Sequence, residues 1–223
     1  KHYTGSSFKR LYHDTFDYLR KEWEQQDTCS LVPSYHSPDK KDYTSYRYPC
    51  PVDDSTVVAV KSGLKDINSL VTIVHGKEKR LSYIGSINSR LDYRNGKIYW
   101  TEIVPGLRWT HENYSVLKCY DLKEGRIKSI TPRQRYLSPS VDKNGKVAAV
   151  SRTTVDGKNQ LVLVELEDGK ELFAFQVPGN AFIKELTFTD QDEVVAVAVT
   201  DAGISLLQFT PSSGQWEELL STA

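Results

Sequence analysis

The sequence of 223 residues is informative first for what it lacks. It has no methionine and only 3 cysteines, and its 29 Lys and Arg residues are balanced by 29 Asp and Glu residues. A net charge of zero argues against a nucleic-acid partner, because binding to phosphates needs a basic excess. No stretch approaches the roughly 18 apolar residues of a membrane helix, so the sequence predicts no transmembrane segment.

The cysteines do not form a disulfide framework, because Cys29, Cys50 and Cys119 are odd in number and share no spacing. Cys119 lies in an apolar stretch and is expected to be a small buried hydrophobic residue. Cys29 and Cys50 either stay free or pair in an oxidising compartment. The absence of methionine and of a signal peptide indicates a fragment or a processed form, unless modified methionines are left unwritten.

Catalytic motifs are absent as well. The histidines are scattered, and none forms the His-Glu-x-x-His pattern or lies near a cysteine pair at zinc spacing. There is no Gly-x-Ser-x-Gly elbow around a nucleophilic serine. Phosphate-binding and dinucleotide-binding glycine motifs do not occur either. The sequence therefore predicts no catalytic residue, no metal site and no cofactor.

What the sequence does contain is a repeat. Apolar strands open at Val57, Ile98, Val147 and Val194, at intervals of 41, 49 and 47 residues. A turn-rich stretch precedes each strand, and Asn95-Gly96 is a strong signal for a two-residue hairpin turn. Intervals in the forties match propeller blades of four strands. The fold class is therefore all-β, a β-propeller with blades at residues 43–86, 87–133, 134–179 and 180–223.

The third repeat shows a family resemblance. It reads Leu137-Ser138-Pro139-Ser140-Val141-Asp142-Lys143-Asn144-Gly145, and the second repeat ends a strand with Tyr120-Asp121-Leu122. These segments resemble the TolB-type, WD40-like propeller repeat. The resemblance is sharpest to large exported proteins of Bacteroides-like bacteria, in which a zinc-peptidase-like domain precedes the propeller. It implies an exported protein in the periplasm or on the cell surface, with an upstream domain of the same polypeptide as one partner.

The number of blades sets a further expectation. Propellers of this family usually close with six or seven blades, whereas four are counted here. A ring that does not close leaves an apolar face uncovered on each end blade. We expect the four blades to be part of a larger propeller, and a closed four-bladed ring or an assembly between chains are the alternatives.

Residues 1–42 differ in kind from the repeats. Apolar residues recur at helical spacing from about Ser7 to Gln25, and Ser6 or Ser7 is a suitable N-cap. The polar face mixes acids and bases, which favours packing on protein over binding to a membrane surface. A linker rich in Pro, Ser and charged residues follows the helix.

One loop is the candidate binding site. The connection between the second and third strands of the second repeat is the longest, and it carries Arg108, Trp109, His111 and Glu112. Trp and Arg are enriched at binding hot spots, and loops commonly carry function. Trp109 can equally be a plug that packs on a neighbouring blade.

The leading hypothesis is a non-catalytic binding or scaffold module that contacts protein, peptide or glycan partners through its loops. The alternative is an accessory or substrate-gating propeller of a larger exported peptidase or glycan-acting enzyme. A hydrolase with its site in the central channel would need ionisable residues that converge on the innermost strands. The positions aligned there by sequence hold none: Pro51, Leu91, Ser140 and Phe188.

Overall fold

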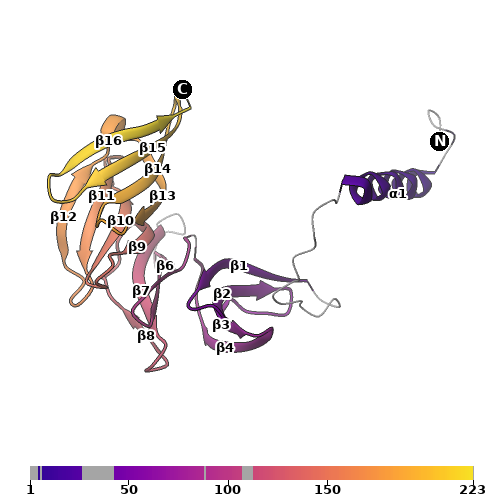
Figure 1. Cartoon of the computed structure of the whole chain (residues 1–223), viewed down its shortest axis with the longest axis horizontal. Helices are drawn as coiled ribbons and strands as arrows, with labels where there is room; N and C mark the ends of the chain where they lie inside the picture. Colours follow the sequence, from indigo (N-terminus) through magenta and orange to yellow (C-terminus); the bar gives the residue numbers. More distant parts are fainter. Residues whose placement is uncertain (1–4, 6, 27–42, 88, 107–112, 223) are drawn as a thin grey trace. The chain divides into compact units, whose positions relative to one another are not determined.

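A computed structural model describes residues 5, 7–26, 43–87, 89–106 and 113–222 (Figure 1). The chain divides into two compact units, Lys1–Tyr35 and His36–Ala223. The described part of the first unit holds one α-helix, and that of the second holds sixteen strands and a short 3-10 turn. No described helix combines the length and the apolar character needed to span a membrane.

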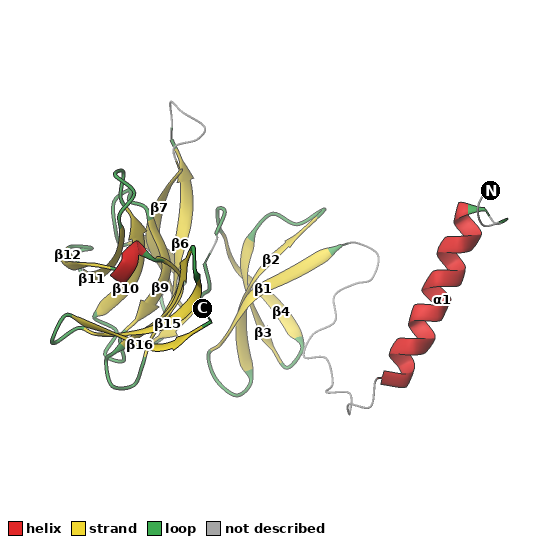
Figure 2. Cartoon of the chain, turned by 90° about the horizontal axis from the view of Figure 1, so that it is seen from above, coloured by secondary structure: helices red, strands yellow, loops and turns green. Residues whose placement is uncertain are grey.

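The first unit contains the predicted helix, α1 (Phe8–Gln26), which is continuous along its length (Figure 2). The backbone N–H of Arg10 donates a hydrogen bond to Ser7 Oγ over 3.3 Å. Ser7 is therefore the N-cap, as its residue type and position predicted. The apolar stripe of the helix is exposed to solvent, including Phe8, Tyr12, Phe16 and Trp23.

The second unit consists of four antiparallel sheets of four strands each. Blade 1 is β1 (Thr44–Pro51), β2 (Thr56–Gly63), β3 (Ser69–Val74) and β4 (Lys77–Tyr83). Blade 2 is β5 (Asp92–Arg94), β6 (Lys97–Pro105), β7 (Asn113–Asp121) and β8 (Arg126–Ser129). Blade 3 is β9 (Tyr136–Val141), β10 (Val147–Thr153), β11 (Asn159–Glu165) and β12 (Glu171–Gln176). Blade 4 is β13 (Phe182–Phe188), β14 (Val194–Thr200), β15 (Gly203–Thr210) and β16 (Gln215–Ser221).

Within each blade the strands follow one another in sequence order, so every blade is a simple meander. This confirms the predicted repeat of four strands. Asn95 and Gly96 have φ angles of 49° and 77°, and the strands pair as Arg94 with Lys97. Both central residues of a type I′ turn need a positive φ, so the Asn-Gly signal was interpreted correctly.

The blades are held together by apolar clusters between neighbours. We call the face of a blade that looks toward the next blade its forward face, and the opposite one its rear face. Val58, Val60 and Leu70 on the forward face of blade 1 cluster with Ile98 and Trp100 of blade 2. Equivalent clusters join blade 2 to blade 3 and blade 3 to blade 4. Among the described residues no such cluster joins blade 4 to blade 1, so the blades form an open series.

Candidate binding site on the innermost strands

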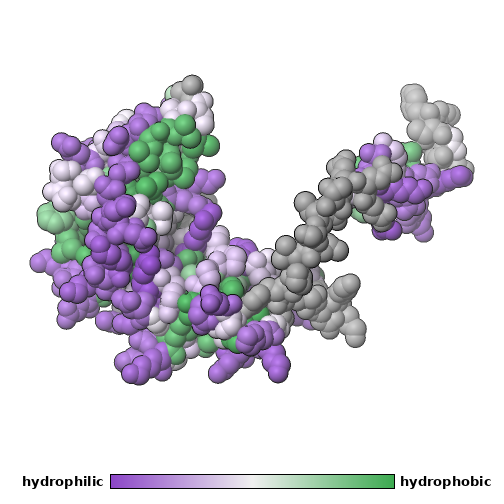
Figure 3. Space-filling model, in the orientation of Figure 1, coloured by the Kyte–Doolittle hydropathy of each residue, from purple (hydrophilic) through white to green (hydrophobic). Residues whose placement is uncertain are grey.

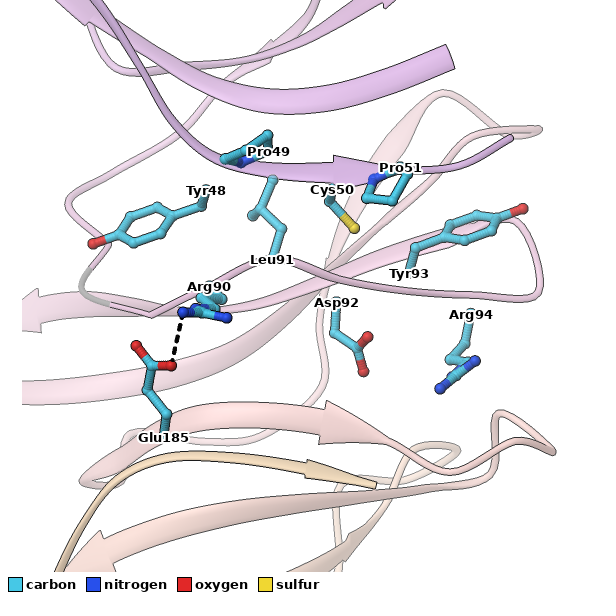
Figure 4. A pocket seen from close by; sticks show the side chains of 10 residues that line it. All are labelled: Tyr48, Pro49, Cys50, Pro51, Arg90, Leu91, Asp92, Tyr93, Arg94 and Glu185. Carbon is cyan, nitrogen blue, oxygen red and sulfur yellow. Dashed lines mark ion pairs between the residues drawn. The ribbon is translucent and has the colours of Figure 1, made fainter. Parts of the chain in front are cut away.

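The innermost strands of blades 1, 2 and 4 line a cavity of about 710 Å³, which we call the inner-strand pocket (Figure 4). Residues of β1, of β5 and of the two positions before β5 form most of its wall, and β13 contributes one carboxylate. Its side chains are mainly aromatic, proline and arginine, a mixture suited to non-covalent recognition. The lining residues are Tyr48, Pro49, Cys50, Pro51, Arg90, Leu91, Asp92, Tyr93, Arg94 and Glu185.

A bulge in β1 shapes one wall of the pocket. The register with β2 shifts between Arg47 and Cys50, and Tyr48 has a φ of 54°. A positive φ is strained for an aromatic residue, so the surrounding fold must hold Tyr48 in place. The same device recurs in β9, where Ser138 has a φ of 46° and precedes a proline. Bulges commonly redirect side chains next to binding sites.

Two charged residues of the pocket form hydrogen bonds with the next blade. The carboxylate of Asp92 accepts hydrogen bonds from the backbone N–H of Val141, over 2.6 Å, and from the Ser140 hydroxyl, over 3.3 Å. Arg94 Nε donates to the carbonyl oxygen of Val141 over 3.2 Å. Burial raises the pKa of Asp92, and its bond from Val141 and the Arg94 charge oppose that rise. These contacts join the innermost strands of blades 2 and 3.

The sequence alignment of the innermost strands was wrong by one residue in blades 1, 2 and 4, where Cys50, Asp92 and Thr187, and not Pro51, Leu91 and Phe188, are the counterparts of Ser140. Asp92 pairs with Tyr99 and Ser140 pairs with Ala149, so Asp92 and not Leu91 is the counterpart of Ser140. β5 has only three residues, so the sequence alone does not show which of them faces which residue of the neighbouring strand. Ionisable residues therefore do converge on the innermost strands, contrary to the expectation from sequence.

Arg90 and Glu185 remain available to a ligand. Arg90 Nη2 lies 3.0 Å from Glu185 Oε2, and the two side chains are 74% and 41% exposed. An ion pair this exposed is worth little, roughly 0 to 1 kcal/mol. A ligand carboxylate or carbonyl can therefore replace Glu185 at the guanidinium at small expense in free energy.

Cys50 is the one thiol in the pocket, and it is a free, buried cysteine. Cys29, its possible partner in a disulfide, lies outside the described residues. Burial first and the charge of Asp92 second, opposed by the charge of Arg94, raise the pKa of the Cys50 thiol from 9.0 to about 11. A thiol with so high a pKa stays protonated at neutral pH and is a poor nucleophile.

Alkaline pH is expected to destabilise the fold through this thiol and through Tyr99, whose pKa burial raises to about 12. Because each pKa is higher in the folded state, its contribution to stability is full below the unfolded pKa and is lost as pH rises through the folded one. The denaturant concentration at the midpoint of unfolding should therefore stay constant up to about pH 9 and decrease between about pH 9 and about pH 12. In Cys50→Ala the loss between about pH 9 and 11 should shrink, and an unchanged loss would contradict the assignment.

The candidate residues from the sequence, Arg108, Trp109, His111 and Glu112, lie outside the described residues. Both flanking strands are described: β6 ends at Pro105 and β7 begins at Asn113. No group of three or more His, Cys, Asp or Glu side chains within the described residues is placed to hold a metal ion. The pocket itself was missed by sequence reasoning, although the alternation of Arg90, Asp92 and Arg94 was a signal that charged side chains share one face of a strand.

Comparison with known proteins supports the fold. No protein-family model and no curated protein matches the chain. Among solved structures, TolB from Acinetobacter baumannii has a TM-score of 0.64 at 13% identity, over 82% of this chain and 44% of that one. A putative TolB from Agrobacterium tumefaciens has a TM-score of 0.60 at 10% identity, over 74% and 61%. The β-propeller domain of the Trilobed protease from Pyrococcus furiosus has a TM-score of 0.52 at 12% identity, over 81% and 58%.

Each likeness extends over all or most of the four-blade region, and this chain spans less than two thirds of the length of each of these proteins. At identities this low the likeness carries the fold alone. It agrees with the meander of each sheet and with the apolar junctions between successive sheets. The chain therefore carries a TolB-like β-propeller module preceded by an amphipathic helix.

Proposed function

We propose that the chain is a non-catalytic binding or scaffold module that holds a protein, peptide or glycan partner in the inner-strand pocket. The observation that carries this proposal is the chemistry of the lining. Arg90, Tyr48 and Tyr93 offer charged hydrogen bonds and aromatic surface, whereas the Cys50 thiol is protonated and Asp92 is tied to blade 3. Such a pocket recognises a ligand without activating a nucleophile.

The loop with Arg108, Trp109, His111 and Glu112 is a second proposed contact. It joins β6 to β7 and so belongs to the blade whose innermost strand lines the pocket. A loop Trp beside Arg fits a partner-binding role. The Trp109→Ala variant distinguishes a binding role from packing of Trp109 on a neighbouring blade. Loss of binding with an unchanged melting temperature supports recognition. A large loss of stability supports the packing role.

A selection experiment tests the binding proposal. A phage-displayed library of random peptides and a glycan array would be probed with the full chain, and the best binder measured by titration. We expect Arg90→Ala to weaken binding by about 10-fold to 100-fold, because a charged hydrogen bond contributes about 1.5–3 kcal/mol. Arg133→Ala, also an exposed arginine but outside the pocket lining, should bind as the native chain does.

Three results would count against the proposal. Equal affinity of Arg90→Ala and the native chain would show that the pocket does not take part in recognition. Failure of both libraries to yield a binder would argue that the chain is not a peptide- or glycan-binding module. Cleavage of the selected binder by the chain would show that the module is catalytic.

The second candidate is an accessory or substrate-gating propeller of a larger exported peptidase or glycan-acting enzyme. The likeness to the propeller domain of the Pyrococcus furiosus protease favours it. On this proposal the partner is an upstream domain of the same polypeptide, zinc-peptidase-like as in Bacteroides-like proteins, and the protein is periplasmic or on the cell surface. Genomic sequence upstream of Lys1 tests it, because a His-Glu-x-x-His motif there favours the enzyme setting.

A further inference from the structure

Arg90 and Glu185 form an ion pair across the inner-strand pocket, from blade 2 to blade 4. Hydrophilic residues cover much of the surface that Figure 3 shows, so a charged side chain by itself marks no site. This pair differs because it lies in a cavity, and Figure 4 shows the two side chains pointing toward one another from opposite walls. A ligand that enters the pocket therefore meets the pair.

The other two charged residues of the lining are held by blade 3. The carboxylate of Asp92 accepts the backbone N–H of Val141 over 2.6 Å, and Arg94 Nε donates to the carbonyl oxygen of Val141 over 3.2 Å. A ligand would have to break these contacts between blades to reach either charge. Exchange of partners is therefore expected at Arg90 and Glu185, which are largely exposed.

The charges around the pocket favour an anion over a cation. Arg47, which precedes Tyr48 in β1, places its guanidinium 5.7 Å from the centre of the Tyr48 ring. Its Nε is buried and has no hydrogen-bond partner in the described part of the chain. With the two arginines of the lining it makes three guanidiniums against two carboxylates. A cleft with an excess of one sign of charge attracts ligands of the opposite sign.

A carboxylate is the anion that suits Arg90. The guanidinium has five N–H donors in a planar fork, which matches the two oxygens of a carboxylate. The contact with Glu185 joins one nitrogen, Nη2, to one oxygen, Oε2, over 3.0 Å. A ligand carboxylate is free to orient and can form two parallel hydrogen bonds. The hydroxyls of Tyr48 and Tyr93, in the same lining, are further donors for it.

The small number of free polar groups favours a peptide over a glycan. Each hydroxyl of a buried sugar needs a hydrogen-bond partner, because an unsatisfied polar group costs free energy. Pro49 and Pro51 have no backbone N–H to offer, and the side chain of Leu91 is apolar. An acidic peptide matches this wall better, with one charged group for Arg90 and apolar atoms for the prolines.

We propose that the inner-strand pocket selects a peptide carboxylate, which binds Arg90 in place of Glu185. Glu185 is then a competitor built into the site. This inference rests on the proposed binding function, and it adds the chemistry of the ligand and the residue that limits its affinity. Because an exposed ion pair is weak, a carboxylate can displace Glu185. A neutral peptide cannot replace its charge and leaves the pair intact.

The peptide selected from the phage-displayed library is the probe, synthesised as selected and with each Asp or Glu replaced by Asn or Gln. We expect the acidic form to bind the full chain at least about 10-fold more tightly than the neutral form. Glu185→Gln should strengthen binding of the acidic form by about 2-fold to 5-fold, because it removes the competitor. Glu217→Gln, at an exposed glutamate outside the pocket lining, is the matched control and should bind as the native chain does.

Two further measurements identify the carboxylate and its partner. Amidation of the C-terminus, tested beside the Asn and Gln replacements, shows whether a terminal or a side-chain carboxylate binds, and loss of affinity in either case supports the proposal. Library selection on Arg90→Glu should yield peptides rich in Lys and Arg, because the charge of the pocket is reversed.

Four results would overturn the proposal. A peptide without any carboxylate that loses affinity in Arg90→Ala would refute it and leave the binding function standing. Unchanged or weaker binding of the acidic peptide by Glu185→Gln would refute the role of Glu185 as a competitor. Binding of a uronic-acid glycan without any peptide binder would refute the choice of a peptide. A chain that binds neither library would refute the inference together with the binding function.

Discussion

Replacing Gly169 with alanine is expected to lower the free energy of unfolding by about 3–5 kcal/mol. Gly169 lies in the turn between β11 and β12 with a φ of 75°. A Cβ atom there would lie 2.0 Å from the carbonyl oxygen of Ile130, which is backbone in the connection from blade 2. Neither backbone can give way without separating blade 3 from blade 2.

Gly157→Ala is the control for this substitution. Gly157 has a φ of 78°, and a Cβ there would meet nothing within 4 Å. It should therefore lose about 1–2 kcal/mol, the strain of the left-handed conformation alone. Chemical denaturation of both variants provides the measurement. Equal losses would mean that the close approach of blades 2 and 3 is absent in solution.

Truncation of Trp100 to alanine is the second substitution with a large expected effect. Trp100 is 0% exposed and fills the junction of blades 1 and 2. Its indole N–H donates to Glu102 Oε2 over 3.4 Å, and Lys118 Nζ lies 2.6 Å from the other oxygen of that carboxylate. Removing the ring leaves a cavity between the blades, so we expect a loss of about 3–5 kcal/mol.

Trp100→Phe separates packing from the hydrogen bond. Phenylalanine keeps much of the buried volume, and Lys118 still pairs with Glu102, so the loss should be about 1–2 kcal/mol. Denaturant titration of both variants, followed by fluorescence of the remaining tryptophans, measures the difference. A loss below about 1 kcal/mol for Trp100→Ala would show that blade 1 folds without this junction.

The repeat was predictable because it rests on local signals. Apolar strands recur at nearly constant intervals, and turns such as Asn95-Gly96 dictate positive φ angles that few other residues tolerate. The helix was predictable for the same reason, from spacing and from Ser7 as its cap. These features need no knowledge of distant contacts.

The pocket was not predictable, because it depends on register between strands far apart in sequence. Arg90 belongs to blade 2 and Glu185 to blade 4, so all of blade 3 lies between them in the sequence, yet their side chains lie 3.0 Å apart. The bulge at Tyr48 also shifts β1 by a residue relative to a simple alternation. An error of one residue in the register assigns every side chain to the wrong face of the strand. For this reason the sequence alignment placed Leu91, and not Asp92, at the position that matches Ser140.

Partners are expected to bind at the innermost strands. Hydrogen–deuterium exchange of the chain with and without its selected peptide or glycan tests this most directly, because amides covered by a ligand exchange more slowly. We expect slower exchange in residues 47–52 and 90–94 and no change in the outermost strand β8. Protection confined to outer strands, with residues 47–52 and 90–94 unchanged, would contradict the account.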